Sequence, residues 1–358
     1  MTKRTISLLL AVLLLGFAAC GQKQSQEPAQ PTESEAPATA APDASPEPPA
    51  ATPEPEAVPS VLRTVGGYAV VPNDNDRRVT YPFMLQTENA VWYLAASDME
   101  LMGEEAFYAG LEDILQYVEA DMADARQALS GRIPDEIPPV EIRTDFCGKA
   151  EISQDAGAYY NGRANFIKLF HGWDMAKFSL LHEYVHYLTV HCAEKKTMHY
   201  FYIETVAEYV SKLLCENRMF RSINLNETEQ PQLRALAAIW GDFDEVKYRN
   251  SCLSESDAYA RGLYDEKPYV CVGQYNTVRR ANKRLPDHLY ELSYAEAVSL
   301  ALYLMERDGA EKYLDNWDLV DEEEMAGLYG YTVAELLTAW AAWNAEQCAA
   351  LGLREEQP

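Results

Sequence analysis

The sequence predicts an α+β fold in which a small mixed α/β lobe precedes a mainly helical lobe. Three stretches of the first half, residues 87–94, 139–146 and 158–170, alternate in polarity or combine β-branched with aromatic residues, as strands do. After residue 174, apolar residues recur almost to the end of the chain at intervals of three and four, the spacing of one helix face. The strands are therefore expected before the helices.

The first lobe is expected to hold a long helix at residues 103–129, between the first two strands. Its apolar residues recur at helical spacing and are Phe107, Leu111, Ile114, Leu115, Val118, Met122 and Leu129. Residues 158–170 contain Asn161 followed by Gly162, the dipeptide that most strongly favours a tight hairpin turn. A β-hairpin is therefore predicted at residues 158–170, as the last β-structure before the helical lobe.

The helical lobe is expected to begin with Asp174 as the N-cap of its first helix. The apolar stripe of this helix consists of Phe178, Leu181, Val185 and Leu188. Three further helices are predicted at 202–214, 294–307 and 332–343. The last of them opens with a Thr-x-x-Glu capping box formed by Thr332 and Glu335.

The first twenty residues have the features of an export signal. A basic start is followed by a short apolar run and by small residues before Cys20. The segment GFAAC resembles a bacterial lipobox, although Phe17 stands where leucine is usual, and this implies cleavage before Cys20 and lipid attachment to its thiol. The expected location is the bacterial cell envelope with a lipid anchor at Cys20, and plain secretion is the alternative.

Residues 21–60 are expected to form a disordered tether. They contain ten of the nineteen prolines and no aromatic residue, so they cannot bury enough apolar surface to offset their ordering entropy. The remaining residues, 61–358, are enough for one domain with a sizeable core. We expect its α/β lobe at about 61–173 and its helical lobe at about 174–358.

The charge balance excludes two classes of partner. The chain has 30 basic and 56 acidic residues and a net charge of −26. Nucleic-acid binding requires clustered basic residues that displace counterions, and docking on anionic lipid requires the same sign of charge. Membrane association is therefore expected through the N-terminal lipid only.

The cysteines leave the disulfide pattern open. If Cys20 carries lipid, six remain, namely Cys147, Cys192, Cys215, Cys252, Cys271 and Cys348. Six cysteines allow fifteen pairings, and the sequence does not select among them.

Residues 180–191, LLHEYVHYLTVH, contain the spacing H-E-x-x-H. His182 and His186 are four residues apart, and Glu183 directly follows the first. Residues four apart on a helix lie on one face, so the two imidazoles can bind one tetrahedral ion. Glu183 is rotated by roughly 100° and stays near that ion, where it suits a base acting on water better than a third ligand. The pattern predicts a single zinc site.

A catalytic zinc ion needs three protein ligands and one open position. Glu204 lies eighteen residues after His186, and Glu208 lies four residues later on the same face, so both are candidates for the third ligand. His191 is about half a turn out of phase on the first helix and is expected at the surface or as a cap. His199 follows in a polar connection and is expected to be structural.

Two interpretations without a catalytic metal remain open. In the first, both histidines are hydrogen-bonded members of a core helix, with no ion. In the second, the zinc site is structural, which requires four protein ligands. No cysteine and no fourth histidine is placed for that role.

The segments HEYVH and FYIETVAEYV resemble the gluzincin metallopeptidases, whose second helix has the pattern N-E-G-x-A-E-Y. The resemblance implies that Glu204 is the third zinc ligand and that Glu208 supports a metal-binding histidine by fixing its ring. Ile203 and Thr205 replace the usual Asn and Gly, and the spacing is one residue shorter than in the aminopeptidase branch. The sequence therefore resembles the gluzincins as a wider clan more closely than it resembles the aminopeptidase branch.

The likeness covers most of residues 87–343. Residues 158–169 are similar to the edge strand that aligns extended substrates in zincins, and residues 294–343 resemble the C-terminal helices of peptidase-MA-like bacterial proteins. A zincin-like fold is implied. Tyr294 matches a tyrosine that steadies the transition state in the aminopeptidase branch, with core packing as its alternative role, and His288 is a second candidate for that function.

The expected function is that of a zinc-dependent hydrolase, which the resemblance narrows to a peptidase with an unidentified peptide or protein substrate. Glu183 would be the general base that activates water. No G-x-M-x-N segment is present to anchor a free amine, which favours an endopeptidase over an aminopeptidase. The alternative is a non-catalytic surface-binding lipoprotein on a zincin scaffold. The presence of Glu183 favours the enzyme, because a binding module needs no base beside the ion.

Overall fold

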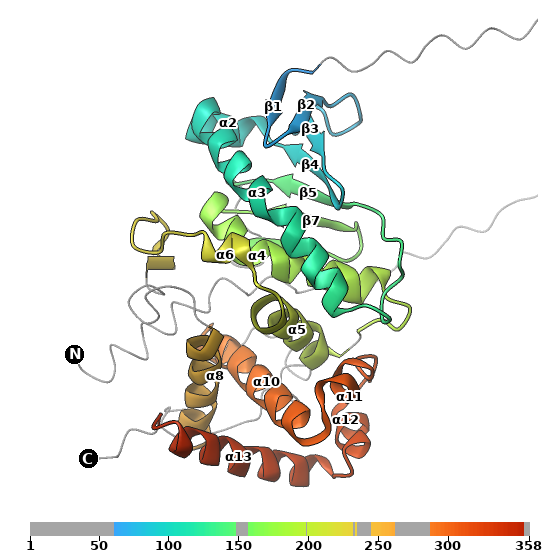
Figure 1. The fold of residues 1–358 in the computed structure, drawn as a ribbon, viewed down its shortest axis with the longest axis vertical. Coiled ribbons are helices and arrows are strands. Elements are labelled where there is room, and N and C mark those ends of the chain that lie inside the picture. Colours follow the sequence, from blue (N-terminus) through green and yellow to red (C-terminus); the bar gives the residue numbers. More distant parts are fainter. Residues whose placement is uncertain are drawn as a thin grey trace, which may run out of the picture.

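The computed structural model describes residues 61–147, 157–197, 199–231, 233–234, 245–261 and 287–353. In this part of the chain a seven-stranded sheet and ten α-helices form a mixed α/β structure, which confirms the α+β class in its general form. Figure 1 places the sheet in the upper half and α8 with α10–α13 in the lower half, while α4 and α5 lie between them. The predictions for residues 1–60, for Cys20 and for Cys271 lie outside the described residues.

The sheet has the strand order β1-β2-β3-β4-β5-β7-β6. Its strands are β1 Arg63–Val65, β2 Tyr68–Pro72, β3 Phe83–Gln86, β4 Ala90–Leu94, β5 Val140–Thr144, β6 Ala158–Asn161 and β7 Phe166–Leu169. The pairs β4–β5 and β5–β7 are parallel, and the other neighbours are antiparallel. Among the described strands, β6 is therefore the edge of the sheet on the side nearest α4.

The three predicted strand regions are confirmed as β4, as β5 and as the hairpin of β6 with β7. The hairpin turn is held by Asn161, whose side-chain oxygen accepts the backbone N–H groups of Arg163 and Ala164 at 3.1 and 3.0 Å. Asn165 completes the turn in the left-handed region with φ 54°, a conformation that Asn adopts more readily than most residues. The turn chemistry thus fixes the register that brings Tyr160 opposite Ile167.

Two helices belong to the sheet region, α2 (Ala96–Met102) and α3 (Glu104–Ala128). The second confirms the predicted long helix, and its predicted apolar face is buried. Gly110 of α3 allows a close approach to α4, because a Cβ atom at this position would lie 2.0 Å from the ring of Trp173. Tight packing of α3 against the start of α4 fixes the helix that carries the histidines.

Helix α4 spans Trp173–His186 and continues as the π-helix η2, Tyr187–Cys192. The predicted N-cap is wrong: Gly172 precedes the first turn with φ 93°, and Asp174 lies inside that turn. The Asp174 carboxylate instead accepts the hydroxyl of Thr228 at 2.6 Å, so it ties a distant loop to the helix. Every residue of α4 except Asp174 is buried, so the helix is enclosed on all sides rather than amphipathic.

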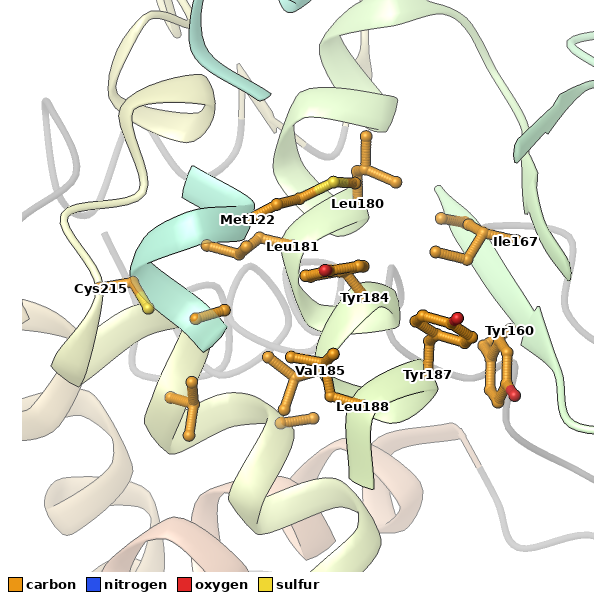
Figure 2. Close-up of a cluster of buried hydrophobic side chains, with 14 of the residues drawn as sticks. Met122, Tyr160, Ile167, Leu180, Leu181, Tyr184, Val185, Tyr187, Leu188 and Cys215 are labelled. Atoms are coloured by element: carbon orange, nitrogen blue, oxygen red, sulfur yellow. The ribbon is translucent and has the colours of Figure 1, made fainter. Parts of the chain in front are cut away.

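The main core fills the space between the sheet, α3 and one side of α4. Figure 2 shows Leu180, Leu181 and Tyr184 of α4 between Met122 of α3 and Ile167 of β7. These side chains are fully buried. Burying a leucine stabilises the fold by about 1.5–3 kcal/mol, so this face holds α4 firmly against the sheet.

The remaining helices are α5 Tyr200–Tyr209, the π-helix η3 Val210–Leu214, α6 Arg218–Arg221, α8 Glu245–Ala260, α10 Asp287–Asp308, α11 Ala310–Leu314, α12 Glu322–Leu328 and α13 Val333–Ala350. The helices predicted at 202–214, 294–307 and 332–343 are confirmed as α5 with η3, as α10 and as α13. The Thr332–Glu335 capping box is present, with both reciprocal hydrogen bonds.

Two further features follow from the described residues. None of their helices is both long and apolar enough to cross a bilayer. No disulfide joins any two of the five cysteines in the described ranges, which are Cys147, Cys192, Cys215, Cys252 and Cys348.

Candidate metal centre

The predicted site residues meet where α4 packs against α5. His182, Glu183 and His186 lie on α4, and Glu204 and Glu208 lie on α5. All five side chains are buried, with exposed fractions of at most 4%. Buried ionisable groups at such density are costly unless they are paired or bind a metal.

The ligand-type atoms of three residues converge. The imidazole rings of His182 and His186 have centroids 4.5 Å apart, and the Nε2 atom of each ring lies 3.4 Å from Oε2 of Glu204. Two atoms that each bind zinc at about 2.0–2.1 Å with tetrahedral geometry are about 3.3–3.4 Å apart. The two observed separations therefore fit ligands of one four-coordinate zinc ion.

The hydrogen-bonding state of these groups also fits a cation. Neither carboxylate oxygen of Glu204 and neither ring nitrogen of His186 has a hydrogen-bond partner, although all four atoms are buried. A buried polar atom without a partner costs about 1–3 kcal/mol or more, and far more if it is charged. A cation between these residues would satisfy the carboxylate and Nε2.

Glu183 is a second candidate for the third ligand, because its carboxylate and the two imidazoles can place ligand atoms within 4.8 Å of one another. Its Oε2, however, accepts the backbone N–H of Tyr160 at 2.7 Å. Glu204 has no such competing bond, and its Oε2 is equidistant from both imidazoles. We therefore assign Glu204 as the candidate ligand and Glu183 as the neighbouring carboxylate.

Glu208 lies behind His182, on the side away from Glu204. Its Oε1 is 2.9 Å from Nδ1 of His182, and its Oε2 accepts from Nζ of Lys212 at 2.7 Å and from the hydroxyl of Tyr248. An acceptor at Nδ1 orients the ring and leaves Nε2 facing the Glu204 carboxylate. This placement agrees with the supporting role expected for Glu208.

The electrostatics favour a cation at the centre. Burial opposes the charged form of His182, yet the carboxylates of Glu204 and Glu208 raise its pKa from 6.5 to about 10. Burial also opposes ionisation of Glu204, but the neighbouring His186 and His182 lower its pKa to about 2. For Glu208, the cations of Lys212 and His182 outweigh burial and hold its pKa well below its usual range. Both carboxylates therefore stay ionised at neutral pH.

The other predicted residues are Tyr294, His191, His199 and His288. Tyr294 on α10 is 3% exposed and packs in an apolar cluster with Phe178 and Tyr248. His191 is exposed, as expected. His199 is structural: it caps the N-terminus of α5 by accepting the N–H of Phe201, and its Nε2 is 3.1 Å from Glu322. The side chain of His288 is not described.

Three contributors to the site have no clear signal in the sequence. The Tyr160 N–H is a backbone group, and only a hairpin prediction with exact register could have placed it beside Glu183. Lys212 has the i,i+4 spacing from Glu208 that favours a helical ion pair, which is a weak signal. Tyr248 is forty residues from Glu208 and carries no signal at all.

Comparison of the chain with protein-family models, with curated proteins and with solved structures found no match. The gluzincin resemblance therefore depends on the motifs of α4 and α5, and it remains a prediction.

Proposed function

We propose that this protein is a zinc-dependent hydrolase, and specifically a peptidase anchored in the cell envelope. The observation that carries the proposal is the position of Glu204 Oε2, 3.4 Å from Nε2 of both His182 and His186, among buried side chains that include Glu183. This arrangement supports three protein ligands with an open fourth position, the pattern of catalytic rather than structural zinc sites.

The roles of the residues follow from their positions. His182, His186 and Glu204 would hold the ion. Bound zinc supplies Lewis acidity and lowers the pKa of water toward neutrality. Glu183 takes the proton from the attacking water and delivers it to the leaving amine. Its hydrogen bond from the Tyr160 N–H fixes the orientation of the carboxylate beside the candidate ligands.

A peptide substrate is supported by the position of β6. This strand is one of the two edges of the sheet in the described part of the chain, and its Tyr160 N–H donates to Glu183. An extended peptide that lay alongside this strand would pass its carbonyl groups by the base. The preference for an endopeptidase and the stabilising role of Tyr294 depend on the resemblance alone.

The test compares the purified full-length protein with two variants, Glu183→Gln and Glu204→Ala. We expect one zinc ion per chain in the wild type and in Glu183→Gln, a loss of zinc in Glu204→Ala, and cleavage of a mixed peptide library by the wild type only, as measured by mass spectrometry. Glu323→Gln, at an exposed position of α12, is the matched control and should behave as wild type. Bound zinc without cleavage would favour the non-catalytic binding protein, and absence of zinc would refute the proposal.

A further inference from the structure

A buried lysine lies behind the candidate metal centre. Lys212, in the π-helix η3, has a side chain that is only 2% exposed. Its ammonium group pairs with Glu208 and lies 5.2 Å from the ring centroids of both Phe178 and Tyr248. Burial lowers the pKa of Lys212, and Glu208 counteracts that effect. A lysine in this position needs a physical reason, because its desolvation is costly.

Glu208 supplies that reason, because it joins Lys212 to His182. One carboxylate oxygen is 2.9 Å from Nδ1 of His182, and the other accepts from Lys212 and from Tyr248. The carboxylate thereby accepts hydrogen bonds from η3 and α8 and lies against the His182 ring of α4. Its two oxygens cannot rotate without breaking at least one of these contacts.

We propose that Lys212 and Tyr248 are positioning residues of the metal centre, which fix the Glu208 carboxylate and through it the ring of His182. The inference rests on the proposed function, because it assigns these residues to the retention of zinc. Both residues would act through the Glu208 carboxylate that they contact. Removing the support of a ligand at a zinc site lowers metal affinity by about 10–100-fold.

The chain offers a matched comparison in Lys177, another buried lysine, on α4 itself. Its side chain is 4% exposed, but its partner Asp113 is 44% exposed, so water stabilises that ion pair. In the pair of Lys212 with Glu208, both side chains are 2% exposed. The pair of Lys212 with Glu208 is enclosed and adjoins His182. The pair of Lys177 with Asp113 faces a solvent-open hollow of about 420 Å³ that is also lined by Asp174 and Thr228. The two lysines therefore separate the effect of burial from the effect on the site.

The experiment measures the zinc dissociation constant of the full-length protein by competition with a chromophoric chelator, using Zn²⁺ alone as the probe. Lys212→Met should raise this constant by about 10–100-fold, and Lys177→Met should change it by less than about twofold. Tyr248→Phe removes one hydroxyl that donates to the same carboxylate and should raise the constant by a smaller factor. It keeps the test decisive if Lys212→Met does not fold, because it introduces no cavity and leaves the ion pair in place.

A cycle with Glu208→Gln distinguishes positioning from general destabilisation. If Lys212 acts through Glu208, the double variant should bind zinc no more weakly than Glu208→Gln alone. The Nδ1–H proton of His182, observed by NMR in histidine-labelled protein, should shift in Lys212→Met and Tyr248→Phe but not in Lys177→Met.

The outcomes separate this inference from the proposed function. A wild-type protein that binds no zinc would overturn both. Zinc binding by the wild type, with an unchanged dissociation constant and an unchanged His182 resonance in Tyr248→Phe and in any folded Lys212→Met, would overturn the positioning role alone. Equal losses in Lys212→Met and Lys177→Met would also overturn it, because burial rather than the contact with Glu208 would then explain the effect.

Discussion

The two sides of α4 differ in what their buried atoms contact. On one side, Leu181, Tyr184 and Val185 pack into the main apolar core (Figure 2). On the other side, His182 and His186 meet the two glutamates of α5. The helix is equally buried on both sides, so solvent access does not distinguish them.

The difference lies in which buried groups lack hydrogen-bond partners. On the apolar side, Leu181 and Val185 carry no polar side-chain atom, and the group without a partner is the neutral hydroxyl of Tyr184. The polar side leaves both nitrogens of His186 and both carboxylate oxygens of Glu204 without hydrogen bonds, which costs free energy of folding. Under the proposed function, the apolar side supplies the stability, and the polar side is organised for a ligand that offsets this cost. Changes on the two sides should therefore have separable effects.

The largest expected effect is on catalysis, from the polar side. Glu183→Gln removes the base but keeps an oxygen that can accept the Tyr160 N–H, so the fold and zinc binding should persist. General base catalysis contributes about 10²–10⁴-fold, and kcat/KM for a peptide identified from the library should fall by that factor. The measurement pairs the rate with the thermal midpoint of unfolding. A substantial loss of stability, or a rate within tenfold of the wild type, would contradict the role of Glu183.

The next effect is on stability, from the apolar side. Leu181→Ala creates a cavity at a fully buried position of α4, which typically lowers the free energy of unfolding by about 2–5 kcal/mol. Denaturant unfolding of the zinc-loaded protein measures the loss, and zinc stoichiometry should remain one per chain. Leu101→Ala, at a position of α2 that is 64% exposed, is the control and should change stability little. Loss of zinc by a folded Leu181→Ala protein would show that the two sides are coupled.

Zinc itself should connect the two sides through linkage. A ligand that binds only the folded state raises the free energy of unfolding by about 2.7 kcal/mol at a free concentration 100 times its dissociation constant. Removal of zinc by a chelator should therefore lower the unfolding midpoint of the wild type, and addition of zinc should restore it. The same removal and addition of zinc should leave the unfolding midpoint of Glu204→Ala unchanged, because that variant lacks one of the three proposed zinc ligands. An equal response in both proteins would place the zinc elsewhere.

Much of the fold and the centre of the site could be predicted because their signals are local. Residues four apart on a helix share a face, so His182 and His186 had to lie together once α4 was recognised. The hairpin of β6 and β7, closed by Asn165 rather than by a tight Asn-Gly turn, and the Thr332–Glu335 capping box are likewise determined by neighbours in the sequence. Such features need no knowledge of the tertiary structure.

The errors and omissions arise where tertiary contacts decide. Aspartate is a residue type that N-cap positions favour, but the Asp174 carboxylate accepts the hydroxyl of Thr228 instead. Gly172 occupies the N-cap position, where φ is positive. Tyr248 reaches Glu208 from another helix, and no local pattern encodes that contact. The enclosure of α4 on all sides depends on α5 covering its polar face, which hydrophobic periodicity alone cannot show.

The smallest expected effect provides a reference far from both sides of α4. Thr332→Ala removes the side-chain cap of α13, where the Thr332 hydroxyl accepts the N–H of Glu335 at 3.3 Å, and should lower the free energy of unfolding by about 1 kcal/mol. Thr338→Ala is the matched control, an exposed threonine within the same helix whose hydroxyl donates to the carbonyl of Ala334. It should leave stability unchanged or slightly raised, because alanine is the better helix former. Neither change should alter the zinc dissociation constant. If Thr332→Ala weakened zinc binding, stability and metal affinity would not be separable. The proposal that one side of α4 supplies stability and the other binds the metal would then be wrong.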